Sequence, residues 1–343
     1  MQTWGIRCVR LGLSALILFA VAMPALAAAK PVRALHLVVA NLSVADARHL
    51  IEVASRGRFN TILLGMPWQN GLLLRSTPWV VPGKYTWSRN DLVDVAEYAR
   101  RKGLEVVPQI ELLSHQEVLL ASPFPGLMFN AFTYDPGNAR TYEIVLPIID
   151  EIIELLHPKA MHIGHDEVAG WRPGRNLLKQ GERILPPDLF LEDVTRLHGY
   201  LRNKGIETWM WGDMLVSPEE FPSMREDALH GIHAGYGKEL RRKIPRDIVI
   251  CDWHYLDDQD EFPSLEAFKA EGFRVIGTIF KNAKTTRNFS HYAAAQGAEG
   301  MIATTWFIPG ARNHAALITS WDELNQVVGG TGEIFYKDFP DAK

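Results

Sequence analysis

One phrase recurs along this 343-residue chain: a polar helix, then a glycine, then a short apolar strand. Apolar residues at helical spacing predict a helix over 43–56, which Gly57 ends before a strand over 59–64. The phrase returns with a helix over 88–102 and a strand over 104–110. Each helix begins with a serine followed three positions later by an aspartate, the spacing of a capping box: Ser43 with Asp46, and Ser88 with Asp91.

The phrase continues to the end of the chain. It predicts eight strands, over 33–39, 59–64, 104–110, 160–163, 206–211, 247–251, 273–278 and 300–306. Further helices are expected over 144–156, 189–204, 264–271 and 287–296, with a closing helix capped by Ser320 and Glu323. Eight alternations favour a (β/α)₈ TIM barrel, with a doubly wound open sheet as the alternative. The helix expected within 214–246 has no clear pattern.

The first 29 residues have the features of a secretory signal peptide. Arg7 and Arg10 precede the apolar run 11–23, and Ala25-Leu-Ala27 offers a small-x-small cleavage pattern. Because the run is short of the roughly 20 residues that span a bilayer, we expect cleavage and no stable membrane insertion. An uncleaved anchor is the alternative. The expected organisation is a signal peptide over 1–29, a catalytic barrel over 30–328 and a C-terminal tail over 329–343.

Composition narrows the class of partner. Without Arg7 and Arg10, 34 basic residues remain against 40 acidic ones, and no basic block argues for nucleic acid. Only Cys251 would survive cleavage, so no internal disulfide can form. Nine of the 10 tryptophans would remain, and indole faces stack well on sugar rings as well as filling cores. The sequence gives no sign of a cofactor and leaves the oligomeric state open.

In a parallel barrel, the chemistry is carried where strands end and the following loops begin. Three of these loops are long, over 66–87, 111–137 and 164–187, and loops of such length are usually functional or disordered. They contain aromatic residues and a histidine, a composition that disfavours disorder: Trp68, Trp79, Trp87, His115 and Trp171.

Two adjacent acids, Asp166 and Glu167, stand at the end of the fourth predicted strand. Burying either one requires partners, so a purely structural explanation is limited to a helix cap. We interpret them as a catalytic acid and an orienting carboxylate that act on one leaving group.

Other strand ends carry side chains that suit a sugar. Arg33 begins the first strand, and its guanidinium could bind two hydroxyls. The third strand leads into Glu111, Ser114, His115 and Glu117. Tryptophans with nearby carboxylates or a tyrosine end later strands: Trp209, Trp211 and Asp213; Trp253, Tyr255 and Asp257; and Trp306.

A metal-dependent hydrolase that uses His162, His165 and Asp166 is an alternative interpretation, since imidazole and carboxylate are common ligands. Alternate strand residues point to opposite faces, and the pattern lacks the helical histidine pair of zinc proteases. We therefore expect no metal.

These residues resemble glycoside hydrolase family 20, the β-N-acetylhexosaminidases. His162-Ile-Gly-His-Asp-Glu167 resembles the family motif His-x-Gly-Gly-Asp-Glu, and the segment 108–115 resembles its third-strand segment that ends in histidine. Arg33, Trp211, Asp213, Tyr255, Asp257 and Trp306 follow in the family's order. The compact form, with Gln109 and the His115-x-Glu117 sequence, is most similar to hexosaminidase D.

The resemblance implies an exo-acting β-N-acetylhexosaminidase with a substrate-assisted retaining mechanism through an oxazolinium intermediate. It gives Glu167 the role of general acid and base, and Asp166 that of holding the acetamido N–H. Tyr255 would hydrogen-bond the acetamido oxygen, and Trp211, Trp253 and Trp306 would enclose its methyl group. Arg33 and Asp257 would bind ring hydroxyls of an N-acetylhexosamine glycan.

The chain departs from the family pattern at several positions. His165 replaces the second glycine of the motif, Gln109 replaces a frequent glutamate, and Phe307 follows Trp306 where glutamate is common. These changes leave open a barrel that binds carbohydrate without cleaving it. A glycosidase that uses a conventional double displacement is a further alternative.

Overall fold

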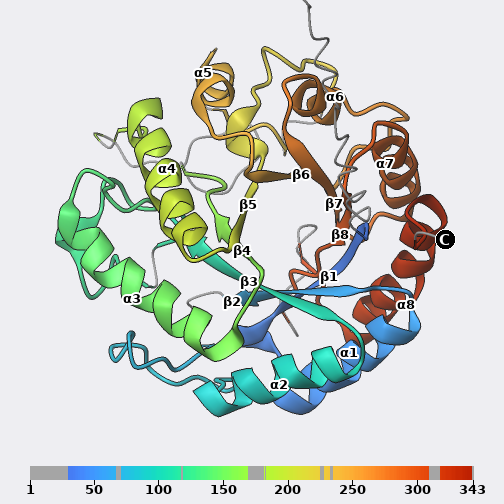
Figure 1. The fold of residues 1–343 in the computed structure, drawn as a ribbon, viewed down its shortest axis with the longest axis horizontal. Coiled ribbons are helices and arrows are strands. Elements are labelled where there is room, and N and C mark those ends of the chain that lie inside the picture. Colours follow the sequence, from blue (N-terminus) through green and yellow to red (C-terminus); the bar gives the residue numbers. More distant parts are fainter. Residues whose placement is uncertain are drawn as a thin grey trace, which may run out of the picture. The chain divides into compact units, whose positions relative to one another are not determined.

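The computed structural model describes residues 30–66, 71–116, 119–168, 181, 183–224, 228–231, 235–308 and 317–341. Internal contacts gather Pro31–Asp341 into one unit, which is the fold described below. Eight parallel strands pair in chain order and close on themselves through β1 and β8 (Figure 1). The strands are β1 Val32–Val38, β2 Thr61–Met66, β3 Glu105–Leu112, β4 Ala160–Gly164, β5 Glu207–Trp211, β6 Val249–His254, β7 Arg274–Ile279 and β8 Gly300–Ala303. The TIM barrel prediction is therefore confirmed.

One helix follows each strand and lies outside the barrel (Figure 1). The helices are α1 Val44–Arg56, α2 Arg89–Arg101, α3 Ala139–Leu156, α4 Pro187–Asn203, α5 Tyr236–Lys243, α6 Pro263–Ala270, α7 Ala283–Ala295 and α8 Trp321–Asp338. Short 3₁₀ turns lie at Val39–Asn41, Pro125–Leu127 and Asp213–Leu215. The helix that the sequence left unplaced within 214–246 is α5.

The capping predictions are confirmed. The side chains of Ser43 and Ser88 each accept from the backbone N–H of the third helical residue, and each aspartate there reciprocates. Ser320 likewise accepts from Glu323 N–H at the start of α8. These caps satisfy amide groups that a helix start otherwise leaves unpaired, so they fix where each helix begins.

Helix α8 continues to Asp338, past residue 329, where the sequence placed the start of a C-terminal tail. The glycine-rich sequence there does not end the helix. A Cβ on Gly332 would lie 1.8 Å from the Gly57 carbonyl oxygen, so glycine at this position lets α8 approach the end of α1. The last helix thereby packs against the first.

The strands are buried on both faces, as a parallel barrel requires. Small and branched side chains fill the interior with three tryptophans: Ala34, Leu63, Val107, Trp209, Trp211, Val249, Trp253, Ile276 and Ile302. Cys251 is also in this layer, where burial raises the pKa of its thiol, consistent with a structural thiol.

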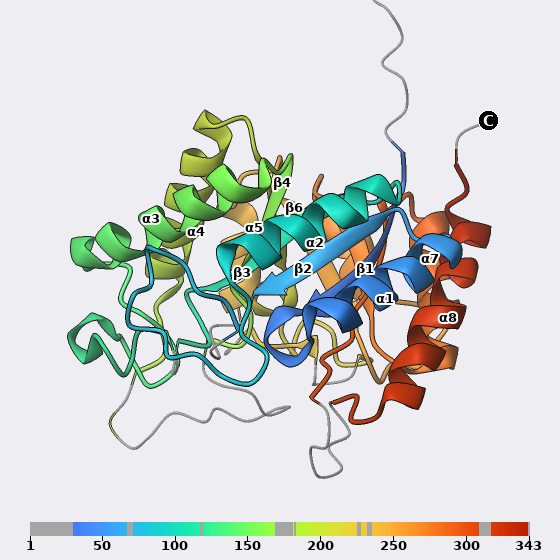
Figure 2. The ribbon, with the colours of Figure 1, turned by 90° about the horizontal axis from the view of Figure 1, so that it is seen from below.

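The amino ends of the strands carry paired charges. Arg33 Nε and Nη1 donate to the carbonyl oxygens of Arg58 and Phe339 at 2.8 Å each, and Nη2 lies 3.0 Å from Asp341 Oδ1. Arg274, at the start of β7, forms ion pairs with Glu207 and Glu299. Figure 2 shows the start of β1 and the end of α8 on one side of the barrel, opposite the arrowhead of β2. At this end of the barrel, the charged side chains of Arg33 and Arg274 are therefore paired within the chain itself.

Candidate active site

Asp166 and Glu167 follow β4 after one intervening residue, His165, at the carboxyl end of the barrel, and are only 8% and 6% exposed. The backbone turns sharply here, with positive φ at Gly164, His165 and Glu167. Non-glycine residues rarely adopt such angles, and their strain is typical of sites where a side chain must be aimed. The Glu167 N–H donates to Asp213 Oδ2 at 3.0 Å, which fixes the turn from the adjacent β5 end.

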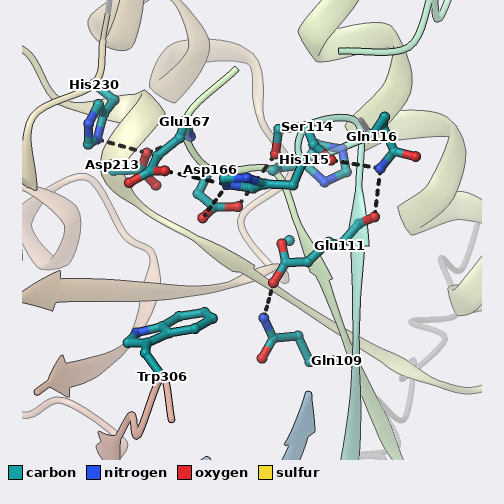
Figure 3. A network of polar contacts seen from close by, with 12 residues as sticks. Gln109, Glu111, Ser114, His115, Gln116, Asp166, Glu167, Asp213, His230 and Trp306 are labelled. Atoms are coloured by element: carbon teal, nitrogen blue, oxygen red, sulfur yellow. Dashed lines mark hydrogen bonds and ion pairs between the residues drawn. The ribbon is translucent and has the colours of Figure 1, made fainter. Parts of the chain in front are cut away.

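His115 bridges the two acids (Figure 3). Its Nε2 lies 3.3 Å from Asp166 Oδ2 and 3.4 Å from Glu167 Oε2. It comes from the loop after β3, where Leu113 and His115 both have positive φ. One imidazolium can therefore contact both carboxyl groups at once.

A third carboxyl group, that of Glu111 near the end of β3, lies beside Asp166 and accepts from Gln109 Nε2 (Figure 3). A Cβ on Gly164 would lie 2.7 Å from Glu111 Oε2, so the motif glycine makes room for this carboxyl group. Gln109, noted in the sequence as a departure, is thus placed as a hydrogen-bond donor.

The environment separates the pKa values of the neighbouring acids. Burial raises the pKa of Glu167 to about 8, so this group holds a proton at neutral pH. Burial opposes ionisation of Asp166 as well, but the charge and hydrogen bond of His115 and a hydrogen bond from Glu111 outweigh it and lower its pKa to about 2. Burial and the negative charge of Asp166 raise the pKa of Glu111. The adjacent pair is therefore one proton donor and one fixed anion, which is how acid and base roles are divided in such sites.

His230 completes the ionisable group and was not among the residues predicted from the sequence. Its Nδ1 lies 3.2 Å from Asp213 Oδ2 (Figure 3). Burial lowers the pKa of His230, but the hydrogen bond and charge of Asp213 outweigh it and raise the pKa to about 9. The residue lies between β5 and α5, where no periodic pattern marks the sequence.

Aromatic side chains form a wall at the carboxyl ends of β5, β6 and β8. The ring centres of Trp253 and Tyr255 are 4.6 Å apart, and Trp306 Nε1 donates to the Tyr255 hydroxyl at 2.8 Å. The Trp211 and Trp306 ring centres are 6.4 Å apart. The wall therefore unites the side chains that the sequence placed on three separate strands.

The comparison with protein families agrees with this arrangement. Residues 50–308 match the model of the glycosyl hydrolase family 20 catalytic domain. The chain belongs to this family.

Curated relatives in the family include "Beta-hexosaminidase 1" of Coccidioides posadasii, 24% identical over 236 residues, which are 59% of this chain and 35% of that protein. The human protein "Hexosaminidase D" is 26% identical over 250 residues, 69% of this chain and 45% of that protein. The chain thus spans less than half the length of each of these relatives. A solved structure of β-N-acetylhexosaminidase from Bacteroides fragilis shares the fold with a TM-score of 0.62, at 16% identity over 88% of this chain and 65% of that one.

The structure corrects the role that the resemblance to family 20 implied for Arg33. The residue was expected to bind sugar hydroxyls, but it begins β1, at the opposite end of the barrel from Asp166. Its donors are engaged by Arg58, Phe339 and Asp341. The guanidinium is therefore a structural clamp.

Asp257 lies beside the aromatic wall, and its carboxyl group faces the protein. Its Oδ2 is 2.9 Å from His254 Nδ1, and His254 Nε2 is 2.9 Å from Ser264 Oγ. The residue thus anchors the loop after β6, and its contact with a ring hydroxyl stays a prediction.

The alternative metal set is not brought together. The His162 ring packs on Trp211, 4.1 Å between ring centres, whereas His165 bonds to Asp193 on α4. In the described part of the chain, the histidine and carboxylate atoms that do converge belong to His115, Asp166 and Glu167, all within 4.8 Å. Burial lowers the pKa of His115, but the charges of Asp166 and Glu167 outweigh this and raise it, so a metal would have to displace that proton.

Three residues singled out in the sequence, Trp68, Glu117 and Trp171, lie outside the described residues. Phe307, which follows Trp306, is buried against Trp321 with ring centres 4.8 Å apart. It therefore packs in the core.

Proposed function

We propose that this chain is a β-N-acetylhexosaminidase that removes a terminal N-acetylhexosamine from a glycan by substrate-assisted catalysis. The observation that carries the proposal is the adjacent pair Asp166 and Glu167, held in opposite protonation states with His115 between them. The names of the relatives, several of them hexosaminidases, support the substrate class.

In the first step, Glu167 protonates the glycosidic oxygen while the acetamido oxygen of the substrate attacks C1. The C1–O bond to the leaving group breaks, and a cyclic oxazolinium forms. Asp166 accepts a hydrogen bond from the acetamido N–H and stabilises the positive charge. Because the nucleophile belongs to the substrate, holding it in place removes much of the entropy cost of a bimolecular step.

In the second step, Glu167, now ionised, takes a proton from water as the water oxygen attacks C1. The oxazolinium ring opens, the acetamido group is restored, and the sugar leaves with its original configuration. Tyr255 accepts from Trp306, and burial raises the pKa of its hydroxyl, so the phenol keeps a proton to donate to the acetamido oxygen. The aromatic wall suits the apolar methyl group.

The test is hydrolysis of 4-nitrophenyl N-acetyl-β-glucosaminide and its galacto epimer by the wild type and by Glu167→Gln. We expect turnover by the wild type, loss of about 10³-fold in the variant, and inhibition by a thiazoline mimic of the oxazoline. Full activity of Glu167→Gln would mean that Glu167 is not the general acid. Turnover without thiazoline inhibition would favour a conventional double displacement.

The presence of His165 in place of the motif glycine suggested a barrel that only binds carbohydrate. The position of the His165 ring does not support that alternative. The ring Nδ1 lies 2.8 Å from the Ile163 carbonyl oxygen, and Nε2 lies 2.8 Å from Asp193 Oδ2. The ring is therefore directed toward these partners and does not fill the space beside the acids.

We also propose that residues 1–29 direct export and are then removed, on the strength of their charge and hydropathy pattern. That segment lies outside the described residues. None of the helices in the described part of the chain has the length and hydropathy of a membrane span. Amino-terminal sequencing of the protein from fractionated cells tests this proposal, and an intact segment in a membrane fraction would indicate an anchor instead.

A further inference from the structure

The motif glycine that His165 replaces is the starting point. His165 directly precedes the acid pair, has φ of 74° and is fully buried. An angle of this kind is easy for glycine and strained for histidine. A strained side chain in this position is kept in place only if its surroundings hold it.

The surroundings do hold it, through both ring nitrogens. Nδ1 lies 2.8 Å from the Ile163 carbonyl oxygen, and Nε2 lies 2.8 Å from Asp193 Oδ2. A carbonyl oxygen only accepts, so Nδ1 carries a proton, and a second proton lies between Nε2 and the carboxyl group. The ring also packs edge-on against Phe190, with ring centres 5.6 Å apart.

Asp193 is itself fixed from two further elements. The Tyr134 hydroxyl donates to its Oδ2 at 2.9 Å, and the Tyr142 hydroxyl donates to its Oδ1 at 2.5 Å. Burial and the charge of Asp193 raise the pKa of both phenols, so they remain donors. The Tyr134 backbone N–H donates to Leu113 O at 3.0 Å, in the loop that also supplies His115. The cluster thus joins the loop after β3, α3, α4 and the end of β4.

We propose that His165 and Asp193, with Tyr134 and Tyr142, form a buried anchor that positions Asp166 and Glu167 for catalysis. The family motif has glycine at this position, whereas in this chain the turn is held by side-chain bonds that a glycine could not make. His165 and Asp193 are positioning residues, because they act through the backbone of the acid pair. This inference rests on the proposed function for its kinetic consequence only.

The main test is His165→Gly, which relieves the strain, restores the family motif and removes the anchor. We expect kcat to fall roughly tenfold with KM within about twofold, since small displacements of a catalytic group are costly and substrate contacts are unchanged. The Glu167 carboxyl group should also titrate at least about half a unit closer to its ordinary pKa, because a looser turn admits water. Carbon-13 NMR, assigned with Glu167→Gln, measures that midpoint.

A second variant, Asp193→Asn, keeps the size of the side chain and an acceptor for the tyrosines, so it guards against a misfolded first variant. We expect a smaller loss of kcat, and no further loss when it is combined with His165→Gly, because the two residues act through each other. His198→Asn is the control, a buried histidine of the same helix that bonds Thr208 Oγ1 at 3.0 Å.

Unchanged kcat and an unchanged Glu167 midpoint in folded His165→Gly would overturn the anchor, as would losses that multiply in the double variant. If the wild type hydrolyses no hexosaminide, the proposed function fails, and the Glu167 midpoint alone then decides on the anchor.

Discussion

The two ends of the barrel are built on opposite principles. At the amino end, Arg33 and Arg274 are matched with carbonyl and carboxylate oxygens. In the carboxyl halves of the strands, several buried polar atoms of the described residues lack a hydrogen-bond partner, among them Gln109 Oε1, His162 Nε2, Trp211 Nε1 and Thr278 Oγ1.

Backbone strain follows the same division. Of the non-glycine residues with positive φ in the described chain, Arg58 and His157 follow helices, and the others lie at the carboxyl ends of strands: Leu113, His115, His165, Glu167 and Trp306. Unpaired polar groups and strained angles both cost stability. The difference teaches that this chain accepts a cost in stability at the end that carries the acid pair and is held by side-chain bonds at the other end.

The largest effect should come from the carboxyl end. In the proposed mechanism, Asp166→Asn removes the anion that faces the developing positive charge, so we expect kcat to fall about 10³-fold. The change also removes the buried carboxylate that pairs with His115, so we expect a lower free energy of unfolding. Steady-state kinetics and thermal unfolding measure the two quantities. Asp94→Asn, the same change at a half-exposed ion pair with Arg48, is the control. Full kcat in folded Asp166→Asn would contradict the assignment of the reaction to the carboxyl end of the barrel.

The next effect concerns stability alone. Gly332→Ala places a methyl group against the Gly57 carbonyl oxygen, so we expect it to lower the free energy of unfolding by about 3 kcal/mol while kcat of the folded protein is unchanged. Gly329→Ala, on the same helix with nothing within 4 Å of the new methyl group, should raise it by about 0.5 kcal/mol. Urea unfolding compares them, and equal effects would contradict the close approach of α8 to α1.

Arg33→Met removes the clamp and leaves two carbonyl oxygens without a donor. We expect a loss of about 2 kcal/mol in the free energy of unfolding and unchanged kcat and KM. Arg56→Met, whose side chain is 80% exposed in an ion pair with Glu52, should change stability little. A raised KM in Arg33→Met would restore the sequence-based expectation that this arginine binds sugar.

The smallest effect is the pH dependence. In the proposed mechanism Glu167 must be protonated to act as the general acid, so kcat/KM should fall roughly tenfold for each unit above its pKa of about 8. Stability should change with it. The folded-state pKa of Glu167 lies above its ordinary value of 4.5, so the folded state binds a proton that the unfolded state has lost.

The free energy of unfolding therefore falls as the pH rises from the ordinary pKa of Glu167, 4.5, to its folded-state pKa of about 8. The pKa of His230 is raised to about 9 in the folded protein, so this group adds to the same trend at higher pH. Calorimetry from pH 5 to 9 should show a weaker trend in Glu167→Gln. An equal trend in both proteins would assign it to other groups.

Much of the fold could be predicted from sequence because each helix–glycine–strand phrase is a local signal. The boundary that was misplaced in α3 depends on a local cap, and the boundary in α8 depends on a contact between distant elements. Helix α3 begins at Ala139 after the Asn138 cap, five positions before the start that periodicity indicated at 144. Helix α8 continues through its glycines because one of them packs against Gly57.

The site divides in the same way. Most of the site could be predicted because its residues lie at or just after strand ends: His115, Asp166, Glu167, Trp211, Tyr255 and Trp306. The sugar-binding role predicted for Arg33 was wrong. The rule that barrel chemistry lies at the carboxyl ends of strands could have prevented this error, since a residue at the start of a strand serves stability. The roles of His230 and Asp193 had no sequence signal, because both act through neighbours far away in the chain.

The clamp at Arg33 also bears on how the chain reaches its native state. Its Nη1 and the carbonyl oxygen that it binds are 306 positions apart, and β1 finds its second neighbour only in β8. Contacts of such separation form late, because a long loop must be closed before they stabilise anything. A ribosome would therefore finish most of the chain before the ring could shut, and until then the edges of β1 and β7 would remain open to other strands.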